Sequence, residues 1–276
     1  MRPAFRFAPS PNGYLHLGHA ASALFTARAA EQAGGRFLLR IEDIDTLRCR
    51  PEFITACCED LAWLGLHWEE PVRCQSEHMA DYTAALARLE AMGLLYPCFC
   101  SRSEIAAAAQ GQCDPEGAPL YAGTCRHLPP GLLAERRAAG IPAALRLDMA
   151  RALAQSPALS FNELSENRRI AADPARWGDV VLARKDIGTS YHLAVVTDDA
   201  LQAISHVTRG RDLFAATDVH RLLQHLLGLP EPAYHHHPLI TDETGRKLSK
   251  SANDRALRSL RAQGISAAEI RASLGY

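Results

Sequence analysis

Residues 9–19 have the sequence PSPNGYLHLGH, and this stretch decides how the start of the chain folds. Immediately before it, Arg6-Phe7-Ala8 predicts the end of a short strand. Within residues 9–19, the prolines and the Asn12-Gly13 pair are turn residues. The Ala-rich run from Gly18 to Gln32 then predicts a buried helix. Phe37–Ile41 then predicts a central strand, so that strand, helix and strand form a βαβ unit of a parallel sheet.

The rest of the chain alternates between helical and strand patterns around one region of different character. We predict helices at 51–65, 76–93 and 213–227, short helices after Ser251, and strands at 180–182, 194–196, 204–207 and 234–240. Between Cys98 and Pro174 lie a cysteine cluster, a Pro-Pro-Gly turn and alternating apolar residues typical of strands. We therefore predict that this region is an insertion that interrupts an α/β core.

The composition is that of a soluble globular protein rather than a membrane or secreted one. Hydrophobic residues make up 47% of the 276 residues, which is enough for a sizeable core, yet no apolar run approaches a membrane span. The start lacks a secretory signal, which predicts a cytoplasmic protein. In that reducing compartment, the eight cysteines indicate free thiols or metal ligands rather than disulfides. With a net charge of -1, any RNA contact must come from local basic patches.

Two histidines flank a glycine where the first predicted strand turns into the helix. A helix start offers free backbone N–H groups and a positive dipole end, which suit a phosphate. His16 and His19 can stabilise charge that moves onto phosphates, and Gly18 lets a nucleotide approach closely. Taken alone, so short a motif is equally consistent with a surface loop that carries two solvated histidines.

A second polar motif, Gly245-Arg246-Lys247-Leu248-Ser249-Lys250-Ser251, lies near the other end of the chain. Two lysines and a glycine on a polar loop suit a mobile clamp over a triphosphate. Taken alone, this motif favours a solvated basic loop.

Together the two motifs resemble the signatures of class I aminoacyl-tRNA synthetases, usually written HIGH and KMSKS. Here they are His16-Leu17-Gly18-His19 and Lys247-Leu248-Ser249-Lys250-Ser251, in the same order and more than 200 residues apart. The resemblance implies a Rossmann-type parallel sheet that is interrupted by an inserted α+β subdomain. It also implies that ATP, with Mg²⁺, binds at His16, Gly18, His19, Lys247 and Lys250, and that the catalytic residues are His16, His19, Lys247 and Lys250.

The residues around the first motif narrow the resemblance to the glutamyl-tRNA synthetase subgroup. They are Arg6-Phe7-Ala8-Pro9-Ser10-Pro11 and Arg40-Ile41-Glu42-Asp43-Ile44-Asp45. L-glutamate carries two carboxylates and one ammonium group, so its pocket needs arginines and an acid. The resemblance implies a glutamate pocket lined by Arg6, Ala8, Ser10, Glu42, Tyr191 and Arg209. Glutamine specificity is the near alternative, and without the resemblance each arginine would be assigned to a surface salt bridge.

Four of the cysteines lie between Cys98 and Cys125 and suggest a structural zinc site, one per chain. On chemistry alone, Cys113 would be the fourth ligand beside Cys98, Cys100 and Cys125. The resemblance instead implies Cys98, Cys100, Tyr121 and Cys125, although the spacer between Cys100 and Tyr121 is longer here than in the relatives. His127 is a further candidate, and a set of unligated thiols is the alternative to zinc.

Other conspicuous residues are assigned no function. The tract His235-His236-His237 resembles a metal-binding run, but it leads into a predicted strand, which favours packing or plain exposure. The three tryptophans, Trp63, Trp68 and Trp177, are interpreted as core or interface residues.

Only 25 residues follow Ser251, which leaves no room for the anticodon-reading region of a full glutamyl-tRNA synthetase. This truncated form resembles the glutamyl-queuosine tRNA(Asp) synthetase family, which attaches glutamate to queuosine in the anticodon loop. We expect a monomer with a first core half (1–95), a zinc-bearing insertion (96–178), a second core half (179–244), and the lysine loop with a short helical tail (245–276).

Three other interpretations remain open at this point. A minimal glutamyl-tRNA synthetase would charge a tRNA 3′ end. A nucleotidyltransferase of another kind would also use His-x-Gly-His, but Arg6, Glu42 and Arg209 argue against it. A non-catalytic RNA-binding paralogue would often lose signature residues, whereas both histidines and both lysines are present.

Overall fold

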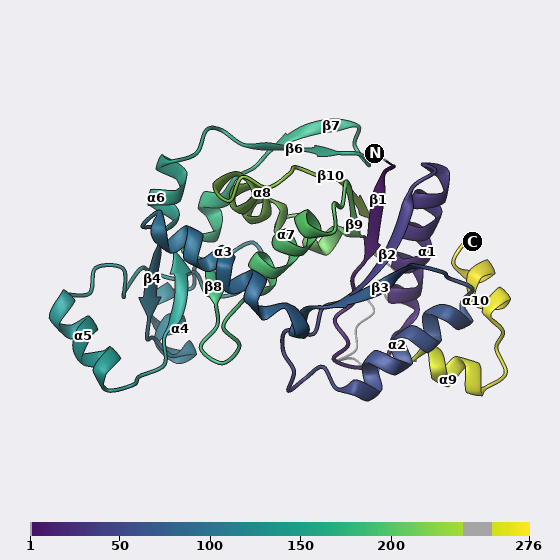
Figure 1. The fold of residues 1–276 in the computed structure, drawn as a ribbon, viewed down its shortest axis with the longest axis horizontal. Coiled ribbons are helices and arrows are strands. Elements are labelled where there is room, and N and C mark those ends of the chain that lie inside the picture. Colours follow the sequence, from purple (N-terminus) through teal and green to yellow (C-terminus); the bar gives the residue numbers. More distant parts are fainter. Residues whose placement is uncertain (1, 240–255) are drawn as a thin grey trace.

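The computed structural model describes residues 2–239 and 256–276. Within these ranges, the larger sheet has seven strands in the order β3-β2-β1-β9-β10-β6-β7 (Figure 1). The strands are β1 Ala4–Phe7, β2 Arg36–Ile41, β3 Glu69–Cys74, β6 Ser160–Glu163, β7 Arg168–Ala171, β9 His206–Gly210 and β10 Ala233–His237. All neighbours are parallel except β7, which pairs antiparallel with β6 at the edge. The mostly parallel α/β core predicted from the sequence is confirmed.

Ten α-helices surround the sheets in the described part of the chain. They are α1 Leu17–Gln32, α2 Pro51–Trp63, α3 Met79–Ala91, α4 Arg102–Ala109, α5 Pro130–Ala138, α6 Met149–Ala154, α7 Tyr191–Leu201, α8 Thr217–Leu226, α9 Leu257–Ala262 and α10 Ala267–Ser273. Helix α1 packs on β1, β2 and β9 and ends at Gly34, whose φ of 58° is the left-handed conformation that glycine adopts without strain. In Figure 1, α9 and α10 lie at one end beside α1 and α2, and α4 and α5 lie at the other.

One sequence prediction of secondary structure is wrong. Residues 194–196 were expected to form a strand, but they lie in the middle of α7. All residues from 193 to 196 are buried. A run of apolar residues that is buried on every side lacks the alternation of apolar and polar residues from which a helix is recognised in sequence. The flanking Thr197, Asp198 and Asp199 are buried as well, so the usual solvent-facing stripe of a helix is missing here.

The region between the two halves of the core contributes to both sheets. Strands β4 (Leu95–Cys98), β5 (Ala144–Leu147) and β8 (Val181–Ala183) form a small separate antiparallel sheet. The hairpin of β6 and β7 instead joins the large sheet, because β6 pairs with β10 at Glu163 and Tyr234. This hairpin brings Glu163 beneath the carboxyl edge of the parallel strands.

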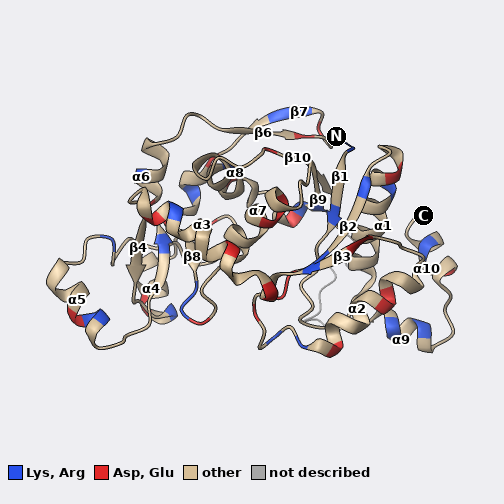
Figure 2. Ribbon diagram, in the orientation of Figure 1, with Lys and Arg blue, Asp and Glu red and all other residues tan. Residues whose placement is uncertain are grey.

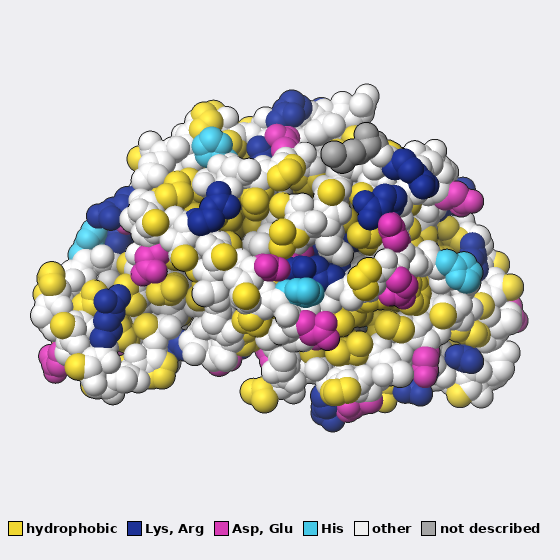
Figure 3. Space-filling model, in the orientation of Figure 1, with side chains coloured by type: hydrophobic (Ala, Val, Ile, Leu, Met, Phe, Trp, Pro, Cys, Tyr) yellow, Lys and Arg dark blue, Asp and Glu magenta, His cyan; other side chains and the backbone are white. Residues whose placement is uncertain are grey.

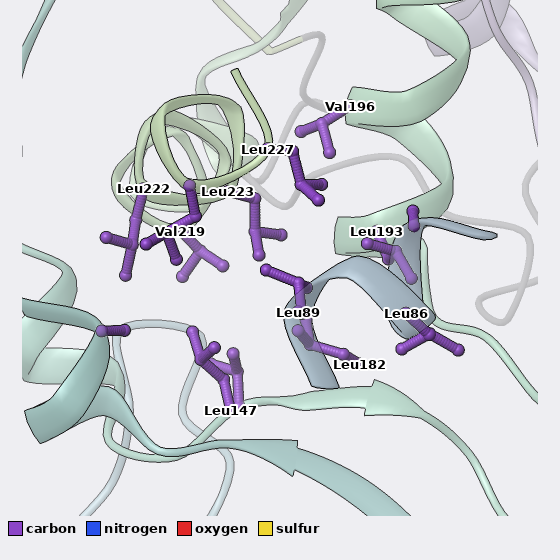
Figure 4. Packing of buried hydrophobic residues seen from close by; sticks show 14 of the residues in the cluster. Leu86, Leu89, Leu147, Leu182, Leu193, Val196, Val219, Leu222, Leu223 and Leu227 are labelled. Atoms are coloured by element: carbon purple, nitrogen blue, oxygen red, sulfur yellow. The ribbon is translucent and has the colours of Figure 1, made fainter. Parts of the chain in front are cut away.

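The main apolar core packs helices α3, α6, α7 and α8 on the small sheet. Side chains from α3, α7 and α8 meet Leu147 of β5 and Leu182 of β8, and the labelled side chains point toward one another (Figure 4). A second cluster packs α1 and α2 against the last helices through Leu257, Leu260 and Ile270. Leu257 also donates its backbone N–H to the Leu15 carbonyl at 2.8 Å, so the last described segment returns to the His16 loop.

The surface carries charges of both signs. Figures 2 and 3 show Lys and Arg interspersed with Asp and Glu over the face drawn, in keeping with the net charge of -1. No helix in residues 2–239 and 256–276 has the length and apolar character needed to cross a membrane.

A buried ionic network lies between the large sheet and α7. The side chain of Arg40, on β2, is fully buried, and it contacts Asp199 at 2.7 Å, Glu42 at 3.1 Å and Asp198 at 3.8 Å. Asp198 is also fully buried and accepts hydrogen bonds from Arg73, Gln75 and Tyr82. Burial opposes the charge on Arg40, but Asp199, Glu42 and Asp198 outweigh it and hold the pKa of Arg40 above its ordinary value.

We expect Asp198→Ala to lower the free energy of unfolding by about 3–5 kcal/mol, because it leaves buried cations without their partner. Urea unfolding followed by circular dichroism measures this. The matched control is Asp173→Ala, whose exposed side chain should be neutral within about 0.5 kcal/mol. Equal stability of the two variants would contradict the importance of the network.

Candidate active site

A cavity of about 750 Å³ opens at the carboxyl edge of the parallel strands. The segment after β1 supplies Ala8, Pro9, Ser10 and Asn12, and Glu42 follows β2 directly. Arg209 and Gly210 end β9, which lies beside β1, and the chain connects these two strands through the rest of the core. Ligands of open α/β sheets bind at such a switch point, outside the carboxyl ends of the strands.

The structure brings the predicted residues of the first motif and of the amino-acid pocket into this one cavity. Its walls include Arg6, Ala8, Ser10, His16, Gly18, His19, Glu42, Tyr191 and Arg209. Lys247 and Lys250 lie outside the described residues. Leu239 lines the cavity and Ala256 forms a β-bridge with His16, so the chain on both sides of the lysine loop is at this site.

The two histidines of the first motif interlock at the start of α1. The backbone N–H of Gly18 donates to His16 Nδ1 at 3.1 Å, and that of His16 donates to His19 Nδ1 at 3.2 Å. The ring centroids are 3.9 Å apart. Because each Nδ1 accepts a hydrogen bond, a neutral ring carries its proton on Nε2. Both imidazoles are thus set as Nε2–H donors beside the helix N-terminus, which is the arrangement that a phosphate needs.

Arg6 and Glu42 line the cavity and also belong to the buried ionic network. Arg6 donates to Asp199 at 2.9 Å and to the Thr208 carbonyl at 3.1 Å, so its charge is partly balanced from within the protein. Burial raises the pKa of Glu42 above its usual value, although Arg40 and Arg6 oppose the shift. A ligand ammonium beside Glu42 would restore the charged form.

Arg209 is held by neutral groups instead of by a carboxylate. Its guanidinium donates to Thr217 at 2.7 Å, to His236 Nε2 at 3.0 Å, to His220 Nδ1 at 3.0 Å and to Tyr191 at 3.4 Å. Burial, with Arg209 itself, lowers the pKa of His236 to about 4 and that of His220 well below the ordinary value. Within the described residues no carboxylate forms an ion pair with Arg209, although Glu116, in the wall of the same cavity, interacts with its charge at longer range.

Sequence reasoning missed the residues that fix Arg209. The carboxylate of Glu163, fully buried, accepts from His236 Nδ1 at 2.5 Å and from the His236 backbone at 3.0 Å. This contact sets the tautomer of His236, so that Nε2 faces Arg209 as an acceptor. The predicted packing role of the histidine tract is confirmed for His236 and His237, which are buried in β10. Glu163 gave no signal, because it lies 73 residues away in the hairpin.

The cysteine cluster is held at the start of the insertion, away from the large cavity. The Sγ atoms of Cys98, Cys100 and Cys125 all lie within 4.8 Å of one another, and those of Cys100 and Cys125 are 3.5 Å apart. Tetrahedral zinc with bonds of about 2.3 Å would require sulfur atoms about 3.8 Å apart. Burial would raise the pKa of Cys125, but hydrogen bonds from Tyr121 and from backbone N–H groups hold it below its ordinary value, which favours a thiolate ligand.

Tyr121, and not Cys113, lies beside these three thiols. Its hydroxyl is 3.9 Å from Cys100 Sγ and accepts the Cys125 backbone N–H at 2.8 Å. The Arg146 guanidinium stacks 3.8 Å from the centroid of its ring, a cation–π contact that holds the ring beside the thiols. Burial and hydrogen bonds to Cys98 and Cys125 raise the pKa of Tyr121 above its ordinary value, so binding to a metal would have to displace the phenol proton. Cys113 is exposed and is not part of the group. The donor set therefore fits a zinc ion whose fourth ligand is Tyr121.

We expect the purified protein to contain one zinc ion per chain, measured by elemental analysis and by release to a chromogenic chelator. Cys98→Ser should lose the ion, and Tyr121→Phe should weaken zinc binding by at least about tenfold, because a ligand is removed. Cys113→Ser is the matched control and should keep it. Zinc loss in the Cys113 variant with retention in the Tyr121 variant would reverse this assignment.

The chain is similar to known proteins in both sequence and fold. Residues 4–271 match the family model described as tRNA synthetases class I (E and Q), catalytic domain. A glutamyl-Q tRNA(Asp) synthetase of Rhodobacter capsulatus is 48% identical over 98% of this chain and 99% of its own length. Another, of Symbiobacterium thermophilum, is 42% identical over 98% of this chain and 85% of its own.

Among solved structures, a glutamate-tRNA synthetase of Elizabethkingia anophelis superposes with a TM-score of 0.77 and 26% identity, over 96% of this chain and 54% of that one. The shared fold thus covers about half of that protein. On the family match and the identity to its relatives, the chain belongs to the class I tRNA synthetases for glutamate and glutamine, in their catalytic domain.

Proposed function

We propose that this protein activates L-glutamate with ATP and transfers it to queuosine in the anticodon loop of tRNA(Asp). The observation that carries the choice of amino acid is that Arg209, which has no described carboxylate as an ion-pair partner, lines the same cavity as Glu42 and the paired histidines. The names of the relatives from Rhodobacter capsulatus and Symbiobacterium thermophilum support the choice of RNA acceptor.

In the first step the α-carboxylate of glutamate attacks the α-phosphorus of ATP and releases pyrophosphate. Arg209 binds the side-chain carboxylate and Glu42 binds the ammonium group. Arg6, Ala8, Ser10 and Tyr191 complete the walls of the amino-acid pocket. The resulting orientation presents the α-carboxylate toward the start of α1, where the two histidines lie.

The phosphates belong at the start of α1. His16 and His19 donate from Nε2 to the oxygens on which charge develops, and Gly18 leaves room for the nucleotide. Lys247 and Lys250 hold the leaving pyrophosphate, as the resemblance to the family implies. Mg²⁺, when bound with ATP, shares the phosphate charge.

In the second step a hydroxyl of the queuosine cyclopentenediol attacks the carbonyl of glutamyl-adenylate and releases AMP. The main alternative acceptor is the 3′ end of a tRNA. The Elizabethkingia anophelis glutamate-tRNA synthetase supports that alternative by its fold, but this chain covers only 54% of it. The Rhodobacter capsulatus relative is covered over 99% of its length, which favours queuosine.

We expect labelled glutamate to be transferred to tRNA(Asp) that contains queuosine and not to the same tRNA without it. Removing the 3′-terminal nucleotide should leave this labelling intact, and nuclease mapping should place the label in the anticodon loop. Labelling of the 3′ end of tRNA(Glu) alone would establish the minimal glutamyl-tRNA synthetase instead.

His16→Ala should lower glutamate-dependent ATP–pyrophosphate exchange about 10²- to 10³-fold, as loss of a charge-stabilising donor does.

Glu163→Gln tests the positioning of Arg209. An amide can donate to His236 Nδ1, which moves the ring proton to Nε2, where it faces the N–H of Arg209. We expect the KM for glutamate in the exchange reaction to rise about tenfold, as the loss of a buried charged hydrogen bond predicts, with the KM for ATP unchanged.

The matched control for this test is Glu166→Gln in the turn of the same hairpin, where the carboxylate pairs with Arg168 and Arg211. This variant should keep the glutamate KM of the parent protein. A rise of both KM values in Glu163→Gln would indicate general distortion of the cavity and not a specific role through Arg209.

A further inference from the structure

A second cavity of about 420 Å³ lies between the insertion and the core, and nothing above gives it a role. Trp177, Asp179 and His192 line it from the core side. The insertion contributes Arg146 of β5 and the loop of residues 114–121. The volume is in the range of small-molecule sites and exceeds what a single planar heterocycle needs.

Two of the residues that line this cavity each carry a buried nitrogen donor that has no hydrogen-bond partner. They are Trp177 Nε1 and Arg146 Nε, whose residues are 4% and 8% exposed. Arg146 donates from Nη1 to the Asp179 carbonyl at 2.6 Å, but within the described residues no carboxylate pairs with it. A buried polar group without a partner is costly, so a ligand acceptor toward which either side chain turns its nitrogen would remove part of that cost.

The same walls offer acceptors and a flat surface. Asp114 and Glu116 line the cavity from the loop, and Asp114 shapes that loop by accepting the backbone N–H groups of Glu116 and Ala118, both at 2.9 Å. The indole of Trp177 is buried, and its ring meets that of His192 edge-on at 5.5 Å. Nitrogen donors, carboxylates and an aromatic ring around one cavity match the chemistry of a guanine-type base, which has acceptor O6 beside donor N1–H and N2–H₂.

The two cavities share part of their wall. Glu116 is a wall residue of both. On α7, Tyr191 faces the large cavity while its neighbour His192 faces the smaller one. A chain of hydrogen bonds joins them, since Arg209 Nη1 donates to His220 Nδ1 at 3.0 Å and His220 Nε2 lies 3.2 Å from His192 Nδ1. A ligand in the smaller cavity can therefore extend past Glu116 toward the bound adenylate.

We propose that this second cavity binds the 7-deazaguanine base of the RNA substrate, flipped out of its loop. The inference rests on the proposed function and adds the place of the base. The N–H groups of Arg146 and Trp177 bind its carbonyl edge, and Glu116 binds the ammonium of the aminomethyl arm that links the base to the cyclopentenediol. The arm then passes along the shared wall, and the diol reaches the glutamyl carbonyl in the large cavity.

The first test uses the unmodified protein and the free base queuine. Queuine should inhibit glutamate transfer competitively with queuosine-containing tRNA(Asp) and leave ATP–pyrophosphate exchange unchanged. Guanine, which lacks the ammonium arm, should inhibit more weakly, and adenine, which lacks O6 and the N2 amino group, should not inhibit. Inhibition of exchange would place queuine in the large cavity and overturn the proposal, as would no inhibition of transfer up to the solubility limit of queuine.

The second test uses Glu116→Gln and Arg146→Gln, with Glu135→Gln on α5 as the matched control because Glu135 is exposed and lines neither cavity. Each cavity variant should lower kcat/KM for the queuosine-containing tRNA about tenfold, the effect of losing one contact to a base edge. In each variant, transfer should fall several-fold more than exchange, because Glu116 also lines the large cavity. The exchange that remains reports on folding. If the Arg146→Gln variant loses ATP–pyrophosphate exchange activity, the base site is judged from Glu116→Gln and from inhibition by queuine.

The two tests distinguish a failure of the base site from a failure of the proposed function. Unchanged transfer in both cavity variants, with queuosine labelled normally by the parent protein, overturns the base site and leaves the proposed function standing. Labelling of a 3′ end by the parent protein overturns the proposed function and the base site with it.

Discussion

The buried guanidinium of Arg40 is the constraint on which the catalytic half of the molecule depends. It ties β2 to α7 through Asp198 and Asp199, and it holds Glu42 at the mouth of the large cavity. Asp199 in turn holds Arg6, so that one buried cation sets the place of two cavity-lining side chains of opposite charge. Replacing such a network by apolar residues is often neutral for stability, so its value here is positional.

The parts of the fold that were predictable from sequence are those with a local signal. The strand, turn and helix around residues 9–19 carry their own turn residues and periodicity, and the structure has β1 and α1 there. Helix α7 was mistaken for a strand because its Leu193–Val196 stretch is buried on all sides. The pairing of β6 with β10 joins segments about 70 residues apart, and neither segment specifies that partner by its own pattern.

The same division holds for the site. Arg6, His16, His19, Glu42 and Arg209 were predictable because they lie in short motifs, and the structure brings them to one cavity. The residues that orient Arg209 were not predictable, because they depend on tertiary contacts. Thr217 and His220 contact Arg209 directly, and Glu163 acts on it through His236. The triple histidine run was the one available signal, and packing explained it adequately at the level of sequence. Motifs thus identify groups that touch a ligand, whereas their supports follow from the fold.

The neutral surroundings of Arg209 explain how the cavity can prefer a carboxylate to an amide. A carboxylate placed beside Arg209 within the protein would satisfy its charge and leave little field for a ligand. Histidines whose pKa is depressed by burial instead accept its hydrogen bonds without cancelling its charge. Glu163, one residue further out, fixes the His236 tautomer while keeping its own charge away from the cavity. No ion-pair partner within the described residues therefore competes with an anionic side chain for the guanidinium, whereas an amide gains only hydrogen bonds.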